Sequence, residues 1–201
     1  MKIISTILLL VLASWMQLVS AGVAPDELIK QTSEKVLTTL SENKAEFEKN
    51  PDKVDELIND IILPHLDFRA MSMLALGKNW RKASKDQRGR FVEAFKIMLI
   101  RTYSKSLTEY TDQAIDFLPY RPAAEGKKTT VVKTLIKQDS GPAIPIDYRL
   151  RIKDDIWKVY DIKIDGISLV TNYRNSFASD IRKVGMDGLI SKLLEKNTRK
   201  S

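Results

Sequence analysis

Apolar residues recur every three or four positions through the first half of the chain, which is the spacing of amphipathic helices. The pattern predicts helices over residues 25–40, 51–63 and 68–76. Asn50 can cap the second helix, which has a proline at its first position, and Asp67 can cap the third. The first half of the chain is therefore expected to be helical.

A fourth and longer helix is predicted after Ser84. Ser84 and Gln87 form a capping box, in which each side chain satisfies the free backbone amide of the other residue. The apolar residues that follow on one face are Phe91, Phe95, Met98, Leu99, Tyr103 and Leu107, and Val92, Ile97 and Ile100 widen that face. We expect this helix to be buried over much of its circumference.

The period of the pattern changes to two in the middle of the chain, which predicts strands. Residues 132–136, 146–152 and 160–164 alternate between apolar and charged positions, and 113–118 is a candidate short first strand. The positions assigned to the apolar face are Val132, Ile146, Tyr148, Leu150, Tyr160, Ile162 and Ile164. Short connections between these strands favour an antiparallel meander that ends at Gly166.

Helical spacing returns over residues 169–181, which Gly185 closes, and over residues 187–194. The order of elements predicts one α+β domain over residues 22–201, with helices packed on one face of a curved antiparallel sheet of about four strands.

The N-terminus has the pattern of an export signal. Lys2 precedes an apolar run, and small residues stand at positions 19 and 21. These features predict a signal peptide over residues 1–21 that is cleaved after Ala21. An uncleaved membrane anchor is the alternative, although the apolar run is short for one and Ser14 and Gln17 interrupt it.

Composition removes several kinds of chemistry from consideration. The chain has no cysteine and one histidine, His65, which lies at a helix break, where a surface or capping role is favoured over catalysis. No glycine-rich phosphate loop, nucleophile elbow or paired carboxylates are recognisable. We therefore expect no enzymatic activity, no metal site and no cofactor. For an exported chain with a net charge of +7, anionic lipid or an acidic partner is favoured over nucleic acid.

The apolar surfaces of the long helix and the sheet allow two interpretations. They form either an ordinary core or a cleft that stays open for a hydrophobic ligand. The candidate cleft residues are Phe95, Leu99, Tyr103 and Leu107 on the helix and Val132, Ile146, Tyr148, Leu150, Tyr160, Ile162 and Ile164 on the strands. The basic residues Arg81, Lys82, Arg88, Arg149 and Arg151 form either a docking patch or an ordinary solvated surface.

Two blocks of sequence resemble the MlaC family, also called the toluene-tolerance auxiliary substrate-binding family. The first comprises LGKNWR at 76–81, AS at 83–84, QR at 87–88, FVEAF at 91–95 and LIRTY at 99–103. The second comprises WKVYD at 157–161, IDGISLV at 164–170 and NYR at 172–174. Asp155-Ile156 departs from the glycine turn that is frequent before the tryptophan, which affects a hairpin only.

The resemblance implies an NTF2-like cone that binds phospholipid in the periplasm of a Gram-negative cell. It implies exchange of lipid between an outer-membrane lipoprotein–porin complex and an inner-membrane MCE-domain ABC transporter, which maintains outer-membrane lipid asymmetry. An NTF2-like enzyme and an envelope adaptor without a ligand remain the competing interpretations.

Overall fold

The computed structural model describes residues 22–109, 114–124, 126–138 and 140–198. The predicted signal peptide, residues 1–21, lies outside this part of the chain. Among the helices within the described ranges, none combines the length and apolarity needed to cross a membrane.

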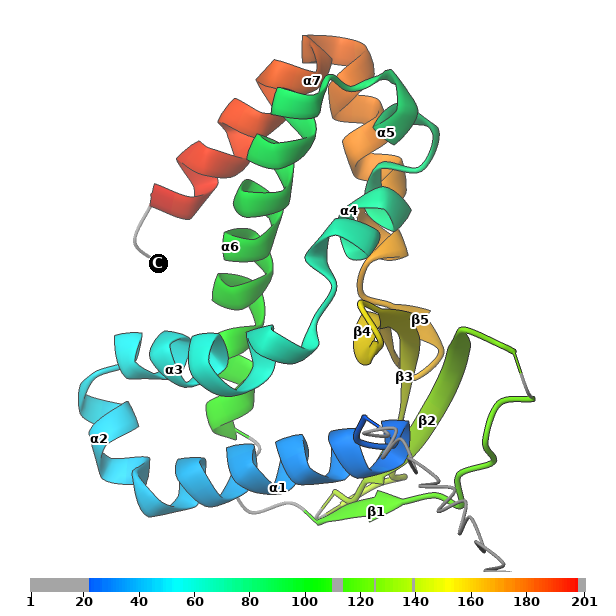
Figure 1. The fold of residues 1–201 in the computed structure, drawn as a ribbon. Coiled ribbons are helices and arrows are strands. Elements are labelled where there is room, and N and C mark those ends of the chain that lie inside the picture. The colour runs from blue at the N-terminus through cyan, green and yellow to red at the C-terminus, as the bar shows by residue number, and fades with distance from the viewer. Residues whose placement is uncertain (1–21, 110–113, 125, 139, 199–201) are drawn as a thin grey trace, which may run out of the picture.

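Helices come first, then a meander of strands, then a long C-terminal helix (Figure 1). The helices are α1 (Pro25–Glu42), α2 (Lys44–Lys49), α3 (Asp52–Leu57), α4 (Phe68–Leu76), α5 (Lys78–Lys82), α6 (Lys85–Glu109) and α7 (Arg174–Thr198). The strands are β1 (Ile115–Phe117), β2 (Thr129–Ile136), β3 (Ile144–Lys153), β4 (Ile156–Ile164) and β5 (Ile167–Ser168). The α+β class is confirmed, whereas α2 and α5 were not predicted.

The predicted caps are present. The Asp67 carboxylate accepts a hydrogen bond from the backbone N–H of Ala70 at 3.1 Å, which starts α4. Ser84 and Gln87 accept from each other's backbone amides at 3.1 and 3.0 Å, which starts α6. Gly77 ends α4 with φ at 53°, in the region that glycine adopts at little cost. These caps allow both ends of α4 and the start of α6 to be predicted from sequence.

The second predicted helix is not uniform. After α3 the chain forms a π-helical turn over Ile58–Ile62 and a 3-10 turn over Leu63–His65. Pro64 has no backbone N–H, and its ring crowds the carbonyl four residues earlier, so a regular α-helix cannot continue through it. Leu66 then forms an isolated parallel bridge with Val159 on β4, which fixes this segment beside the sheet.

The sheet has five antiparallel strands in the order β1-β2-β3-β4-β5. The sequence predicted about four. Gly166 does not end the sheet. Asp165 and Gly166 both have positive φ, 49° and 77°, and form a tight turn that returns the chain to the sheet as β5. Lys163 pairs there with Ser168.

A β-bulge changes which residues of β4 face inward. Arg149 pairs with Asp161, but its neighbour Leu150 pairs with Val159, so Tyr160 has no partner on β3. Val159 therefore lies on the inner face and is 3% exposed, although the simple alternation assigned it to the outer face. Tyr160 lies on the outer face, where the Arg149 guanidinium sits 4.9 Å from its ring centre. The inward assignment of Tyr160 was wrong for this reason.

Two lobes share the long helix α6 (Figure 1). Its N-terminal half packs with α4, α5 and α7, and its C-terminal half runs down beside α3 toward α1 and the sheet. We expected α6 to pack along the sheet, but its first half instead belongs to a separate helical core.

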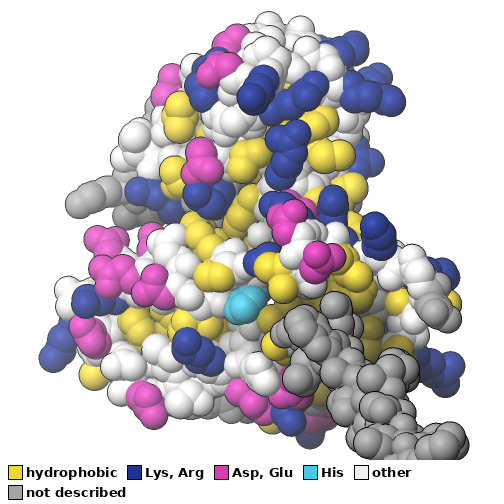
Figure 2. All heavy atoms as spheres, viewed as in Figure 1, with side chains coloured by type: hydrophobic (Ala, Val, Ile, Leu, Met, Phe, Trp, Pro, Cys, Tyr) yellow, Lys and Arg dark blue, Asp and Glu magenta, His cyan; other side chains and the backbone are white. Residues whose placement is uncertain are grey.

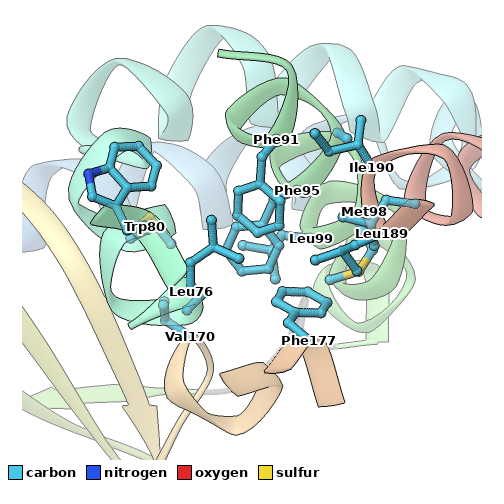
Figure 3. Packing of buried hydrophobic residues seen from close by; sticks show 14 residues of the cluster. Leu76, Trp80, Phe91, Phe95, Met98, Leu99, Val170, Phe177, Leu189 and Ile190 are labelled. Carbon is cyan, nitrogen blue, oxygen red and sulfur yellow. The ribbon is translucent and has the colours of Figure 1, made fainter. Parts of the chain in front are cut away.

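That helical core is built around aromatic rings (Figure 3). Phe95 lies 5.5 Å from both Phe91 and Phe177, measured between ring centres, and Phe177 stacks on Tyr173 at 5.4 Å. Leu76, Trp80, Met98, Val170, Leu189, Ile190 and Leu193 complete the cluster. Helix α7 is interrupted at Gly185, with φ at 74°, and this kink allows the second part of α7 to fold back against α6.

Candidate ligand cavity

A cavity of about 430 Å³ lies between α1, the turns after α3, the C-terminal half of α6 and the inner face of the sheet. Its lining is mostly branched aliphatic. The helical side contributes Ile29, Val36, Leu37, Leu40, Ile58, Ile62, Leu63, Leu66, Leu99, Ile100 and Leu107, and the sheet contributes Ile115, Ile136, Ile144, Ile146, Ile162 and Ile164. A volume of this size falls in the range of about 300–1,000 Å³ that is typical of small-molecule sites.

Strand register produces the isoleucine wall. Ile136 on β2 pairs with Ile115 on one side and Ile144 on the other, and Ile146 pairs with Ile164. Directly paired residues of antiparallel strands point to the same face of the sheet. Four strands therefore present one continuous apolar surface to the cavity.

Seven of the eleven candidate ligand residues line the cavity: Leu99, Tyr103, Leu107, Ile146, Tyr148, Ile162 and Ile164. The other four do not. Phe95 is fully buried in the helical core, Leu150 and Val132 are buried beneath the first part of α1, and Tyr160 faces outward at the bulge.

The cavity walls from α1 and from the turns after α3 were missed. The apolar residues of these segments were predicted as ordinary helix stripes. The run Ile61-Ile62-Leu63 was a usable signal, because three consecutive apolar residues exceed a single stripe. Ile62 and Leu63 remain partly exposed, and both line the cavity.

Few polar groups reach the cavity, and none forms a recognisable catalytic arrangement. Burial raises the pKa of Tyr103, and a hydrogen bond with Tyr173 raises it further. Burial also raises the pKa of Tyr148, and the hydroxyls of Thr134 and Ser33 act in the opposite direction. Both phenols are therefore neutral at pH 7. Within the part of the chain that the structure describes, no aspartate or glutamate lines the cavity and no side-chain cluster could hold a metal ion.

His65 lines the same cavity and is half-buried. Burial lowers its pKa from the usual 6.5, and the positive charges of Lys158 and Lys35 lower it further. Below about pH 6.5 His65 binds a proton more readily in the unfolded chain than in the folded one. The free energy of unfolding is therefore unaffected by this residue above that pH and decreases as the pH falls below it.

We expect His65→Gln to reduce the loss of stability on acidification. Urea unfolding of the wild type and the variant at about pH 7.5 and about pH 5.5 measures this, because the difference between the two proteins cancels the titration of the carboxylates. Equal losses in both proteins would contradict a depressed pKa of His65.

The candidate docking residues fall on two separate surfaces. Arg81 and Lys82 are exposed on α5, and Figure 2 shows Lys and Arg side chains gathered over this helical lobe. Arg88 donates to the backbone carbonyls of Trp80 and Arg81 at 2.9 and 3.2 Å, and its guanidinium lies over the Trp80 ring. Arg88 thus has a structural role in joining α5 to α6.

Arg149 and Arg151 lie on the outer face of the sheet. Arg149 approaches the buried Asp161 carboxylate at 3.3 Å, and Arg151 approaches the buried Asp67 carboxylate at 3.6 Å. Asp161 also accepts a hydrogen bond from the Ser168 hydroxyl at 2.7 Å. These two arginines therefore neutralise buried carboxylates of the fold.

An α+β domain with a partly open, mostly aliphatic cavity between its helices and its sheet has the architecture of a ligand-binding protein. The family model described as MlaC protein matches residues 30–195, so the chain belongs to the MlaC family.

Individual relatives agree with this membership. Toluene tolerance protein ttg2D of Pseudomonas putida is 30% identical over 181 residues, which cover 90% of this chain and 83% of that protein. The intermembrane phospholipid transport system binding protein MlaC of Haemophilus influenzae is 23% identical, covering 86% and 82% of the two chains. A solved structure of the phospholipid-binding protein from Ralstonia solanacearum, in complex with a phospholipid, is 33% identical with a TM-score of 0.76, covering 85% of this chain and 94% of that one.

Proposed function

We propose that this protein is a periplasmic phospholipid carrier. The observation that carries the proposal is the isoleucine-lined cavity, whose walls keep apolar side chains such as Ile62, Ile144 and Ile164 partly exposed. Exposed aliphatic surface inside a concave site is stabilised by an apolar occupant. The phospholipid in the Ralstonia solanacearum relative supports a diacyl lipid as that occupant.

Acyl chains account for affinity without a specific headgroup site. Each buried methylene contributes about 0.8 kcal/mol, so burial of one long chain exceeds the cost of ordering it. The headgroup can stay largely outside, which gives weak selection among headgroups.

Transport of phospholipid between membranes requires one complex that supplies the lipid and another that accepts it. The name of the Haemophilus influenzae relative, an intermembrane transport system binding protein, supports exchange with an inner-membrane MCE-domain ABC transporter and an outer-membrane lipoprotein–porin complex. Exchange between them would maintain outer-membrane lipid asymmetry. The signal-like pattern of residues 1–21 supports a periplasmic location.

The two competing interpretations, an enzyme and an adaptor without a ligand, differ in the residues that they require in the cavity. An NTF2-like enzyme would need a carboxylate or histidine placed to exchange a proton with substrate, and His65 is the one candidate of that kind among the described lining residues. An adaptor would need no ligand at all.

Native mass spectrometry of the protein purified from the periplasm of the cells that produce it, followed by organic extraction, tests the proposal. We expect a mass increase that extracts as diacyl phospholipid of mixed headgroups. A protein without a bound mass that also rejects added phospholipid would favour the adaptor, and tight selection for one headgroup would contradict binding through acyl chains alone.

A further inference from the structure

Three basic residues from three different elements lie near the cavity, where the charges of Lys35 and Lys158 both act on the His65 imidazole. His65, from the turn that follows α3, lines the cavity and reaches the surface, where it is the cyan group in Figure 2. Lys158 on β4 pairs with Arg151, so its side chain leaves the sheet from the outer face, and it donates a hydrogen bond to the carbonyl of Pro64, next to His65. Lys35 on α1 lies one helical turn after Thr32, which also lines the cavity.

The charge of this group is not compensated. Neither Lys35 nor Lys158 forms an ion pair with any carboxylate that the structure describes. The electrostatic influences on the His65 imidazole come from these two lysines, and both oppose its protonation. By contrast, Arg149 and Arg151, which belong to the same sheet, each form an ion pair with a buried carboxylate. A local excess of positive charge at the edge of an aliphatic cavity is suited to an amphiphile with an anionic group at one end.

We propose that Lys35, His65 and Lys158 bind the phosphate group of the lipid whose acyl chains fill the cavity. This inference rests on the proposed function and adds a polar recognition element to it. Lysine ammonium groups have three donors each, so Lys158 retains two for a phosphate after its bond to Pro64. The Thr32 hydroxyl, on the cavity side of α1, is a further donor within this region.

Phosphate recognition explains how a carrier can exclude neutral lipids without choosing among headgroups. Every glycerophospholipid has a phosphate group on its glycerol, and diacylglycerol with the same acyl chains lacks it. Removal of the three basic groups should therefore reduce affinity for all phospholipids alike and leave affinity for diacylglycerol unchanged.

The experiment compares the delipidated wild type with the variant Lys35→Gln/His65→Gln/Lys158→Gln. Binding of phosphatidylglycerol, phosphatidylethanolamine and diacylglycerol of identical acyl chains is measured by competition with a fluorescent lipid. We expect the wild type to prefer both phospholipids to diacylglycerol, and the variant to lose about ten-fold in affinity for the phospholipids only, as for removal of charge-assisted hydrogen bonds.

The matched control is Lys30→Gln/Lys163→Gln, which removes two lysines from the same elements, α1 and β4, whose charges do not act on His65. It should bind all three lipids as the wild type does. Equal losses in both variants would assign the effect to net charge and overturn the proposal. A wild type that binds diacylglycerol as tightly as phospholipid would overturn the phosphate site alone, whereas a wild type that binds no lipid would overturn the carrier function with it.

Discussion

Ile162→Asp is expected to abolish phospholipid loading while the protein remains folded. Ile162 lies on the cavity side of β4, paired with Tyr148, and is only partly buried. In the empty cavity the new carboxylate can remain hydrated. Entry of acyl chains would remove that water, and an unpaired buried charge costs several kcal/mol. Affinity should therefore fall at least about 100-fold, which corresponds to about 2.7 kcal/mol.

Ile156→Asp is the matched control, because Ile156 belongs to the same strand but is 45% exposed and lies outside the cavity. Native mass spectrometry of both variants gives the fraction loaded, and circular dichroism gives the fraction folded. If Ile162→Asp carried as much phospholipid as Ile156→Asp, the acyl chains would have to occupy some other part of the molecule.

Phe95→Ala is expected to have the opposite profile, a large loss of stability with retained loading. The Phe95 ring is fully buried and contacts Phe91, Tyr173 and Phe177, and it does not line the cavity. Truncation of such a ring leaves a cavity in a close-packed core and costs about 3–5 kcal/mol. Urea unfolding of delipidated protein measures this cost.

Leu107→Ala provides the comparison on the same helix. Leu107 is half-buried and lines the cavity, so its truncation removes little packed surface and should cost about 1 kcal/mol. Lipid loading should weaken in Leu107→Ala and persist in folded Phe95→Ala. The reverse pattern would place the ligand site in the helical lobe.

Local signals in the sequence predicted the elements better than their partners. The Ser84–Gln87 capping box and the Asp67 cap marked two helix starts correctly, since capping depends on residues a few positions apart. Alternation also located β2, β3 and β4. The stripe of α6 did not reveal its partners, because Phe95 and Leu99 look alike in a pattern although one faces α7 and the other reaches the cavity.

The bulge at Tyr160 shows a second limit of sequence reasoning. One extra residue on β4 reverses the facing of every position before it, and no residue type marks the insertion. Val159 and Tyr160 were therefore assigned to opposite faces from those they occupy. Whether apolar faces meet as a core or remain apart as a cavity likewise depends on how α1 and α6 diverge, which a single sequence does not encode locally.

Separation of the helical core from the cavity wall affects how the protein can change over evolution. Of the buried residues in the helical core, only Met71 and Leu99 also line the cavity. Exchange of the wall isoleucines for valine or phenylalanine would alter the depth available to an acyl chain at a cost of about 1–3 kcal/mol per position, while the aromatic cluster continues to stabilise the domain. Preferences for chain length can therefore diverge among descendants of one scaffold without loss of the fold.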